Sequence, residues 1–367
     1  MRTRFLLAAM LFVNCAVGGN SPFPLQIEMR TPTAATVFPS AGHQYAVYEL
    51  YLTNFSGGPQ KIRSIEVLDA DDAAAKPLAT FEGKQLDEIL ERGAVRLPAD
   101  RSDLYQLNAG VTVVAYMWVP FDANARVPGR LRHRVLTDDS SGEGAVVSTH
   151  GGELHVLSPP MRGAGWLASD GPSNLPDNHH RRGIWISNGQ LTISRRFATD
   201  WILTKKGQGS SGDPKDRRSY WGYGQEVFAV GDATVVTARD GQPENVPGFG
   251  EDFHPAVPVT LETVGGNHIA LDLGGGQYAW YFHLQPGSVR VEAGEHVRRG
   301  QLLGKIGCSG DARMPHLHFE VTTSGTVLAG EGVPYLIDHY RIWTQDKTWD
   351  ARTAELPLDT MLVDFGR

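Results

Sequence analysis

The first half of the chain consists of short runs in which apolar and polar residues alternate. Between Tyr48 and Thr53, every second residue is Tyr or Leu, and this period of two predicts a β-strand with one buried face. Residues 65–68 and 111–119 are rich in apolar and β-branched side chains, which also favours strands. Several such strands, separated by turn residues, predict a β-sandwich-like domain over residues 23–158.

One segment breaks this alternation. Leu86, Ile89 and Leu90 lie at helical spacing and predict a single helix. No part of residues 23–158 gathers the side chains that a catalytic site needs, so we expect this domain to be an accessory module that binds or positions.

The second half begins after a segment rich in Pro, Gly, Ser and Asn, residues 159–178, which is typical of a linker. Turn signals such as Asn188-Gly189 recur beyond it without any long helical pattern. We therefore expect a mostly antiparallel β-sheet over residues 179–330. Residues 331–367 are assigned to a C-terminal extension.

Length and charge narrow the class of protein. A chain of 367 residues with 41% hydrophobic content is long enough for two domains. Its formal net charge of −7 disfavours nucleic acid as a partner. Oligomeric state cannot be predicted from these features.

The first 18 residues resemble a secretory signal. Arg2 and Arg4 precede the apolar run Phe5–Val13, and small residues follow up to Gly18. This arrangement predicts cleavage after residues 1–18 and an exported protein, periplasmic or extracellular. The apolar run is shorter than the roughly 20 residues of a membrane-spanning helix, and no later run comes closer. We thus expect no integral membrane segment after cleavage.

The two cysteines allow no internal disulfide in such a product. Cys15 lies in the signal, where it is either removed or a site for lipid attachment, and Cys308 would then remain alone. Packing and a bound metal are the stabilising contributions that remain.

The sharpest chemical signal is His316-Leu317-His318, on an apparent strand. Alternation places both imidazoles on one face, where one can bind a metal and the other can move a proton. Taken alone, such a pair is more often structural or a coincidence on the surface. The surrounding sequence is what favours a functional interpretation.

Four ordered motifs surround this pair: Tyr-x-His-Leu at 281–284, a Val-x-x-Gly repeat at 291–304, Gly-x-Ser-Gly at 307–310 and His-Leu-His-Phe-Glu at 316–320. In this order they resemble the lysostaphin/LytM-type zinc metalloendopeptidases, which have the duplicated hybrid motif fold. The resemblance implies a compact antiparallel sheet with a substrate groove. It also implies zinc-dependent hydrolysis of peptide cross-links or stem peptides of bacterial peptidoglycan.

The resemblance further implies individual roles. His318 would bind Zn²⁺, while His283 and His316 would be the catalytic histidines, with roles that could be exchanged. The family's remaining ligands come as His-x-x-x-Asp. Asp200 matches the aspartate, but Arg196 stands where the histidine would be, and an arginine offers no lone pair to a metal.

Another histidine must therefore supply the ligand, or the site is broken. A hairpin turning at Asn188-Gly189 would return the chain beside its start, and strict pairing would set His179 opposite Ala198 and His180 opposite Phe197. Alternation then favours His179, whereas a bulge would favour His180. Relatives with a similar His-Arg-Arg segment favour His180 as the ligand, together with Asp200 and His318. The alternative is a catalytically inactive relative that binds cell wall or activates another hydrolase.

Overall fold

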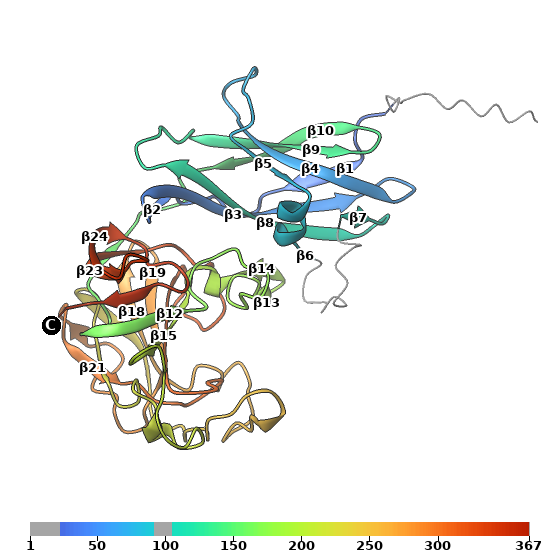
Figure 1. Ribbon diagram of the computed structural model, residues 1–367. Helices are drawn as coiled ribbons and strands as arrows, with labels where there is room; N and C mark the ends of the chain where they lie inside the picture. The colour runs from blue at the N-terminus through green and yellow to red at the C-terminus, as the bar shows by residue number, and fades with distance from the viewer. Residues whose placement is uncertain (1–22, 92–104, 367) are drawn as a thin grey trace, which may run out of the picture.

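The computed structural model describes residues 23–91 and 105–366, and its regular structure is almost entirely β-strand. The expected signal at residues 1–18, with Cys15, lies outside the described residues. Two lobes follow one another along the chain (Figure 1). Every described strand pair is antiparallel except β11 with β23, as expected for a mostly antiparallel protein.

The N-terminal lobe contains two five-stranded sheets packed as a sandwich, and one short helix. The first sheet comprises β1 (Ile27–Arg30), β2 (Phe38–Ser40), β3 (His43–Asn54), β6 (Leu90–Glu91) and β8 (Thr112–Asp122). The second comprises β4 (Gln60–Asp69), β5 (Ala79–Glu82), β7 (Gln106–Leu107), β9 (Arg130–Thr137) and β10 (Ser141–Ser148). The predicted helix is present as α1 (Lys84–Ile89) and buries Leu86 and Ile89.

Strand β3 differs from its prediction because it is buried on both faces. Its even-numbered residues, such as Tyr48 and Leu50, pack into the core between the two sheets. Its odd-numbered residues, including Glu49 and Tyr51, are also buried, at 2% and 6% exposure. The second lobe covers this other face, and a contact between lobes cannot be seen in the alternation of one strand.

The second lobe is organised around a sheet of eleven strands. These are β11 (Val156–Leu157), β12 (Ala164–Ser169), β15 (Thr199–Leu203), β17 (Ala233–Arg239), β18 (Asn267–Gly274), β19 (Gln277–Leu284), β20 (His296–Val297), β22 (Leu317–Thr322), β23 (Leu336–Trp343), β24 (Trp349–Glu355) and β25 (Leu362–Asp364). Two small sheets pair β13 (Trp185–Ser187) with β14 (Gln190–Thr192), and β16 (Glu226–Phe228) with β21 (Leu302–Lys305). Three 3₁₀ turns are η1 (Ser194–Phe197), η2 (Arg217–Ser219) and η3 (Gly250–Asp252).

The structure differs from the sequence-based boundaries at both ends of this lobe. Residues 159–178, predicted to be a linker, contain β12, which pairs with β15 and β25. Residues 331–367, assigned to an extension, provide β23, β24 and β25 to the same sheet. The strand period in β12 is carried only by Trp166 and Ala168, which are buried, between glycines and prolines that indicate turns.

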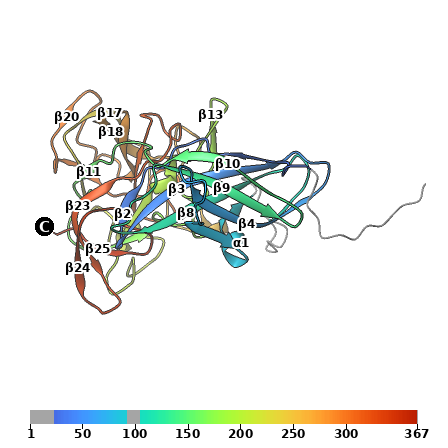
Figure 2. The same cartoon turned by 90° about the horizontal axis from the view of Figure 1, so that it is seen from above.

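The two lobes share one hydrophobic cluster. Phe38 and Val47 of the N-terminal lobe belong to the main core of the second lobe, and the ring centroid of Phe38 lies 5.5 Å from that of Phe197. Seen from above, the sandwich extends away from β23, β24 and β25 (Figure 2). Among the described residues, no helix is long and apolar enough to cross a membrane.

Candidate active site

The register of three neighbouring strands gathers polar side chains on one face of the large sheet. In β15, β22 and β19, Asp200 pairs with His318, and His318 pairs with Phe282. Directly paired residues share a face, so these three side chains lie together. Their neighbours along the strands, such as Phe319 and Tyr281, point to the opposite face and form the hydrophobic core.

Asp200 is the centre of this cluster. Its Oδ1 lies 2.8 Å from His318 Nδ1, 3.4 Å from His316 Nε2 and 3.6 Å from His180 Nε2. All three imidazoles are buried, with residue exposures between 2% and 7%. One carboxylate oxygen thus faces a nitrogen of each of three histidines.

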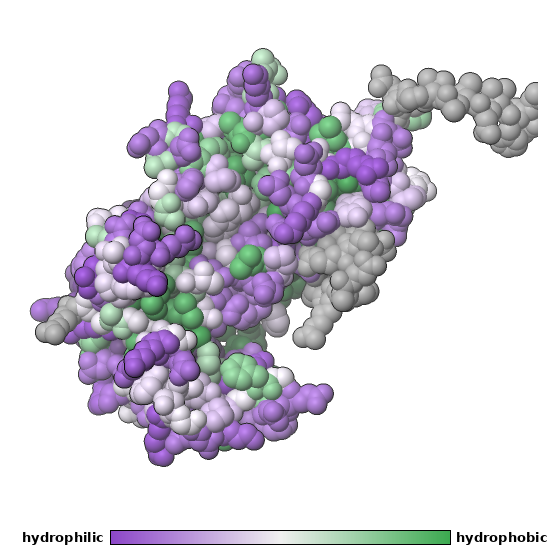
Figure 3. All heavy atoms as spheres, viewed as in Figure 1, coloured by the Kyte–Doolittle hydropathy of each residue, from purple (hydrophilic) through white to green (hydrophobic). Residues whose placement is uncertain are grey.

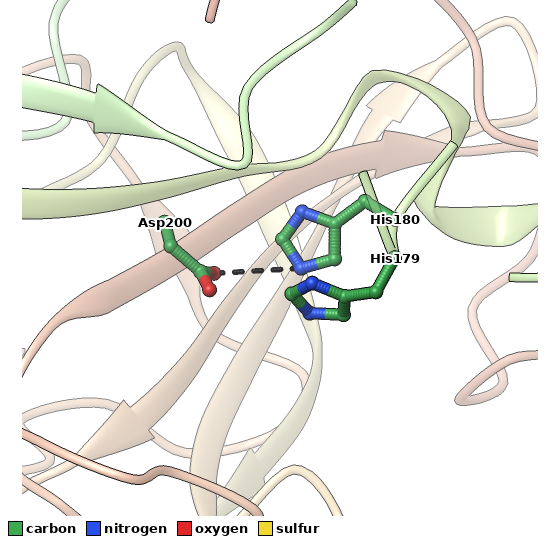
Figure 4. Close-up of side chains that lie close together, drawn as sticks. All are labelled: His179, His180 and Asp200. Atoms are coloured by element: carbon green, nitrogen blue, oxygen red, sulfur yellow. Dashed lines mark ion pairs between the residues drawn. The ribbon is translucent and has the colours of Figure 1, made fainter. Parts of the chain in front are cut away.

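The structure places His180 and His179 differently. His180 is buried, its Nδ1–H donates to the Asp170 carbonyl at 2.8 Å, and its Nε2 faces Asp200 (Figure 4). The side chain of His179 is 55% exposed, and its Nδ1 lies 3.3 Å from Asp170 Oδ1. His179, His180 and Asp200 have donor atoms within 4.8 Å of one another, but only His180 is fixed by burial and a backbone acceptor.

The expected hairpin is present, but it ends before the two candidate histidines. Strands β13 and β14 pair Trp185 with Thr192 and Ser187 with Gln190, which is the register that the Asn188-Gly189 turn predicts. The pairing ends there, because a turn precedes β13 and η1 follows β14. Strand alternation therefore does not determine which histidine faces Asp200.

His283 reaches the site through an irregularity in β19. Simple alternation would place it on the core face, beside Tyr281. The pairing of β18 with β19 shifts by one residue between Asn267 and Ile269, and His283 has a φ of +66°, as in a β-bulge that redirects a side chain. Its ring centroid lies 4.8 Å from that of His316. A strained backbone at a clustered histidine is typical of functional sites.

The remaining ring nitrogens have defined partners. His316 Nδ1–H donates to the Met314 carbonyl, and His283 Nδ1–H donates to the Ser309 carbonyl, each at 2.8 Å. Glu320, two residues after His318, places Oε2 3.3 Å from His318 Nε2. These contacts orient Nε2 of His283 and His316 toward the cluster.

The charges of the cluster depend on burial and on Asp200. Burial by itself raises the pKa of Asp200, but His316 and His180 outweigh it and hold that pKa well below its usual range. Burial lowers the pKa values of His180 and His283, so both are neutral. Burial also opposes charge on His318, yet hydrogen bonds with Asp200 and Glu320 raise its pKa to about 9. Burial lowers the pKa of His316 too, but the negative charge of Asp200 and a hydrogen bond with it outweigh burial and raise that pKa.

The cluster lies in a groove of about 760 Å³. The cluster provides part of its polar lining, and other segments add apolar side chains, among them Trp185, Phe249, Val259, Leu261 and Val327. Figure 3 shows a recess below the N-terminal lobe with hydrophobic residues at its edge. None of these groove residues was predicted from the sequence; for Phe249, Val259 and Leu261 the available signal is that apolar side chains recur in the loop before β18.

Arg196 does not line this groove. Its guanidinium is buried and donates to Glu49, Glu331 and the Gly332 carbonyl. The residue at the family's usual ligand position therefore faces the N-terminal lobe. The imidazole near Asp200 that comes from this part of the chain is that of His180, which precedes the hairpin.

The donor set fits zinc. An imidazole that donates one N–H to a carbonyl or carboxylate presents its other nitrogen as a lone pair. His180 does so through Asp170, and His318 through Glu320. Two such nitrogens and a carboxylate oxygen are the three-ligand set of catalytic zinc sites. A cation bound there would replace the proton that His318 otherwise holds.

Comparison with known proteins agrees with the motifs. A profile of Peptidase family M23 matches residues 220–329. Lysostaphin of Staphylococcus simulans is 37% identical over 75 residues, which are 20% of this chain and 15% of that protein. Glycyl-glycine endopeptidase ALE-1 of Staphylococcus capitis is 41% identical over 61 residues, 16% of either chain. The chain thus spans only a small part of the curated relatives that it matches.

Among solved structures, the catalytic domain of the antimicrobial peptidase lysostaphin from S. simulans shares 20% sequence identity. The match covers 46% of this chain and 88% of that one, with a TM-score of 0.25. The family match includes His283, His316 and His318 and begins after His180 and Asp200. Residues 220–329 thus match peptidase family M23, and their ordered histidine motifs are similar to those of its lysostaphin/LytM type.

Proposed function

We propose that this protein is a zinc-dependent endopeptidase that hydrolyses peptide cross-links or stem peptides of bacterial peptidoglycan. The observation that carries the proposal is the convergence of His180, His316 and His318 on one oxygen of Asp200, at 2.8–3.6 Å. His283 lies beside this cluster, and all of them open into one groove. A structural site would have no reason to keep further histidines next to its ligands.

In this proposal His180, Asp200 and His318 hold the metal. Zinc bound by three protein ligands supplies a Lewis acid that polarises a carbonyl and lowers the pKa of water. The carbonyl of Asp170 and the carboxylate of Glu320 orient the two imidazoles. Their role is to keep the lone pairs of His180 and His318 directed at Asp200.

His283 and His316 would handle protons and charge. Each donates Nδ1–H to a backbone carbonyl, so Nε2 is the atom that faces the substrate. Neutral His283 has an unprotonated Nε2, which would accept the proton of the attacking water. His316, whose pKa is raised beside Asp200, would donate a hydrogen bond from Nε2 to the oxyanion or protonate the leaving amine, and the geometry permits the exchange of these two roles.

The groove supports a peptide substrate. Its volume is about 760 Å³, and its lining combines apolar side chains with the polar groups of the cluster, as ligand sites commonly do. One relative is named a glycyl-glycine endopeptidase, which supports a cell-wall cross-link as the target. An exported location, periplasmic or extracellular, is expected from residues 1–18 and agrees with that substrate.

The inactive alternative depends on Arg196. A chain that had lost its ligand histidine could still bind cell wall through the groove. The side chain of Arg196 is engaged elsewhere, and His180 provides a nitrogen near Asp200. The alternative therefore has no further support, although a direct measurement decides between the two.

The test is zinc content and cell-wall solubilisation, measured on the chain without residues 1–18. We expect about one zinc per chain and clearance of a peptidoglycan suspension. His180→Ala, Asp200→Ala and His318→Ala should lose both. His179→Ala is the matched control, since it removes the neighbouring imidazole and should keep both.

Two outcomes would overturn the proposal. Wild-type protein that takes up no zinc and stays inert when zinc is supplied would support the binding alternative. Loss of zinc in His179→Ala with retention in His180→Ala would assign the ligand to the other histidine.

A further inference from the structure

Glu49 is a buried carboxylate of the N-terminal lobe that faces the second lobe. It lies on the odd-numbered face of β3, opposite Tyr116 of β8, and is 2% exposed. Burial would raise its pKa, but the charges of Arg196 and Arg181 outweigh burial and lower that pKa to about 2. Glu49 is therefore an anion at every relevant pH.

Two arginines of the second lobe hold this anion. Arg196 donates from Nε to Oε1 at 3.0 Å and from Nη2 to Oε2 at 2.7 Å, a two-point contact. Arg181 donates from Nη1 to Oε1, and its guanidinium carbon lies 4.7 Å from the centre of the Tyr116 ring. Both arginines are buried, at 4% and 0% exposure. Bidentate pairing with arginine fixes orientation as well as distance.

These arginines adjoin the proposed ligands along the chain. Arg181 directly follows His180, and Arg196 lies in η1, four residues before Asp200. Neither segment is held by a sheet at these points: His180 and Arg181 lie in turns, and η1 is a single 3₁₀ turn. One carboxylate therefore links the turn that contains His180 to the 3₁₀ turn that precedes β15, the strand that contains Asp200.

The network is also balanced in charge. Glu331 accepts from Arg196 Nη2 at 2.6 Å, so two carboxylates face two guanidinium groups. Removing one buried member leaves the others uncompensated, which is strongly destabilising for the segments that carry them. Movement of these segments by a fraction of an ångström would alter the distances around Asp200.

We propose that Glu49 is a positioning residue for the metal centre, acting on His180 and Asp200 through Arg181 and Arg196. The inference rests on the proposed function, because it assumes that these side chains hold zinc. It makes the N-terminal lobe a structural part of the metal site. If the contact only stabilised the interface between the lobes, its loss would lower stability without any change at the metal.

The experiment compares Glu49→Gln with Glu66→Gln in the full chain without residues 1–18. Glutamine keeps the shape and removes the charge. Glu66 is the matched control, because it pairs with Arg134 at 2.7 Å within the same lobe, between strands β4 and β9 of the sheet that does not contain β3. The readouts are the zinc dissociation constant, from competition with a chromophoric chelator, and the visible absorption spectrum of the Co²⁺-substituted protein, which reports ligand geometry.

We expect Glu49→Gln to weaken zinc binding about 10–100-fold, as changes behind metal ligands typically do, and to shift the Co²⁺ spectrum. Glu66→Gln should match the wild type in both. A folded Glu49→Gln protein with wild-type affinity and spectrum would overturn the inference. Wild-type protein that binds no zinc would instead overturn the proposed function, and the inference with it.

A second variant keeps the test decisive if Glu49→Gln does not fold. Glu331→Gln removes the partly exposed partner of Arg196 and leaves Glu49 in place. It should weaken zinc binding by a few-fold and shift the Co²⁺ spectrum in the same direction. Unchanged values in this variant would count against the role of the network.

Discussion

Replacing Arg196 by histidine would restore the residue that the family motif has at this position. We predict that Arg196→His creates no metal ligand and instead destabilises the protein. Arg196 lies in η1, and its side chain is directed toward Glu49 and away from the groove. An imidazole in its place starts from the same backbone and faces the N-terminal lobe.

The magnitude follows from the contacts that would be lost. Arg196 makes four hydrogen bonds, at 2.6–3.0 Å, three of them to carboxylates. Removing one partner of a buried ion pair costs about 3–5 kcal/mol. Glu49 would keep Arg181, and the side chain of Glu331 is 21% exposed and can be solvated. The cost should therefore lie near the lower end, at about 3 kcal/mol.

Urea unfolding, followed by tryptophan fluorescence, measures this loss in the single variant. Zinc content then tests the absence of a new ligand in the double variant His180→Ala/Arg196→His. We expect the double variant to hold no more zinc than His180→Ala. Recovery of zinc in the double variant, or wild-type stability in Arg196→His, would refute the geometric reasoning.

Two further predictions concern other histidines. His283→Ala should keep about one zinc per chain and lose about 10²–10⁴-fold in kcat, since His283 handles protons without binding metal; loss of zinc would make it a ligand. Burial lowers the pKa of His133 to about 4. In the folded protein, neutral His133 accepts a hydrogen bond from the Tyr48 hydroxyl and donates one to the Ala145 carbonyl. As the pH falls, His133 gains a proton in the unfolded chain before it does so in the folded protein. The free energy of unfolding is therefore highest above pH about 6.5 and drops by about 3 kcal/mol toward pH 4. Urea unfolding across this range checks it, and a flat profile in wild type, or an equally steep one in His133→Phe, would contradict it.

The sequence could predict what depends on local pattern. The antiparallel β-class, the helix at Lys84–Ile89 and the shared face of His318 and Glu320 all follow from periodicity within one segment. Non-local pairing had no such signal. Strand β12, in the middle of the chain, pairs with β25, which lies near its C-terminus. The glycines and prolines around β12 are equally typical of a linker.

The site shows the same division. The ordered motifs identify His283, but alternation places it on the core face, and only the bulge with a positive φ turns it toward His316. The hairpin register was predictable from its turn, yet it ends before the two candidate histidines. Bulges and broken pairing depend on tertiary packing, which no window of sequence contains.

The departure at Arg196 and the presence of the N-terminal lobe are one structural feature. A buried arginine at this position needs a carboxylate, and Glu49 provides it from β3. With position 196 committed to that contact, the nitrogen near Asp200 must come from another segment, and His180 is tied to the same carboxylate through Arg181. Without such a lobe, arginine at this position would lose its two-point contact with Glu49 and keep only Glu331 and the Gly332 carbonyl as partners. An arginine at position 196 and the accessory lobe should therefore occur together.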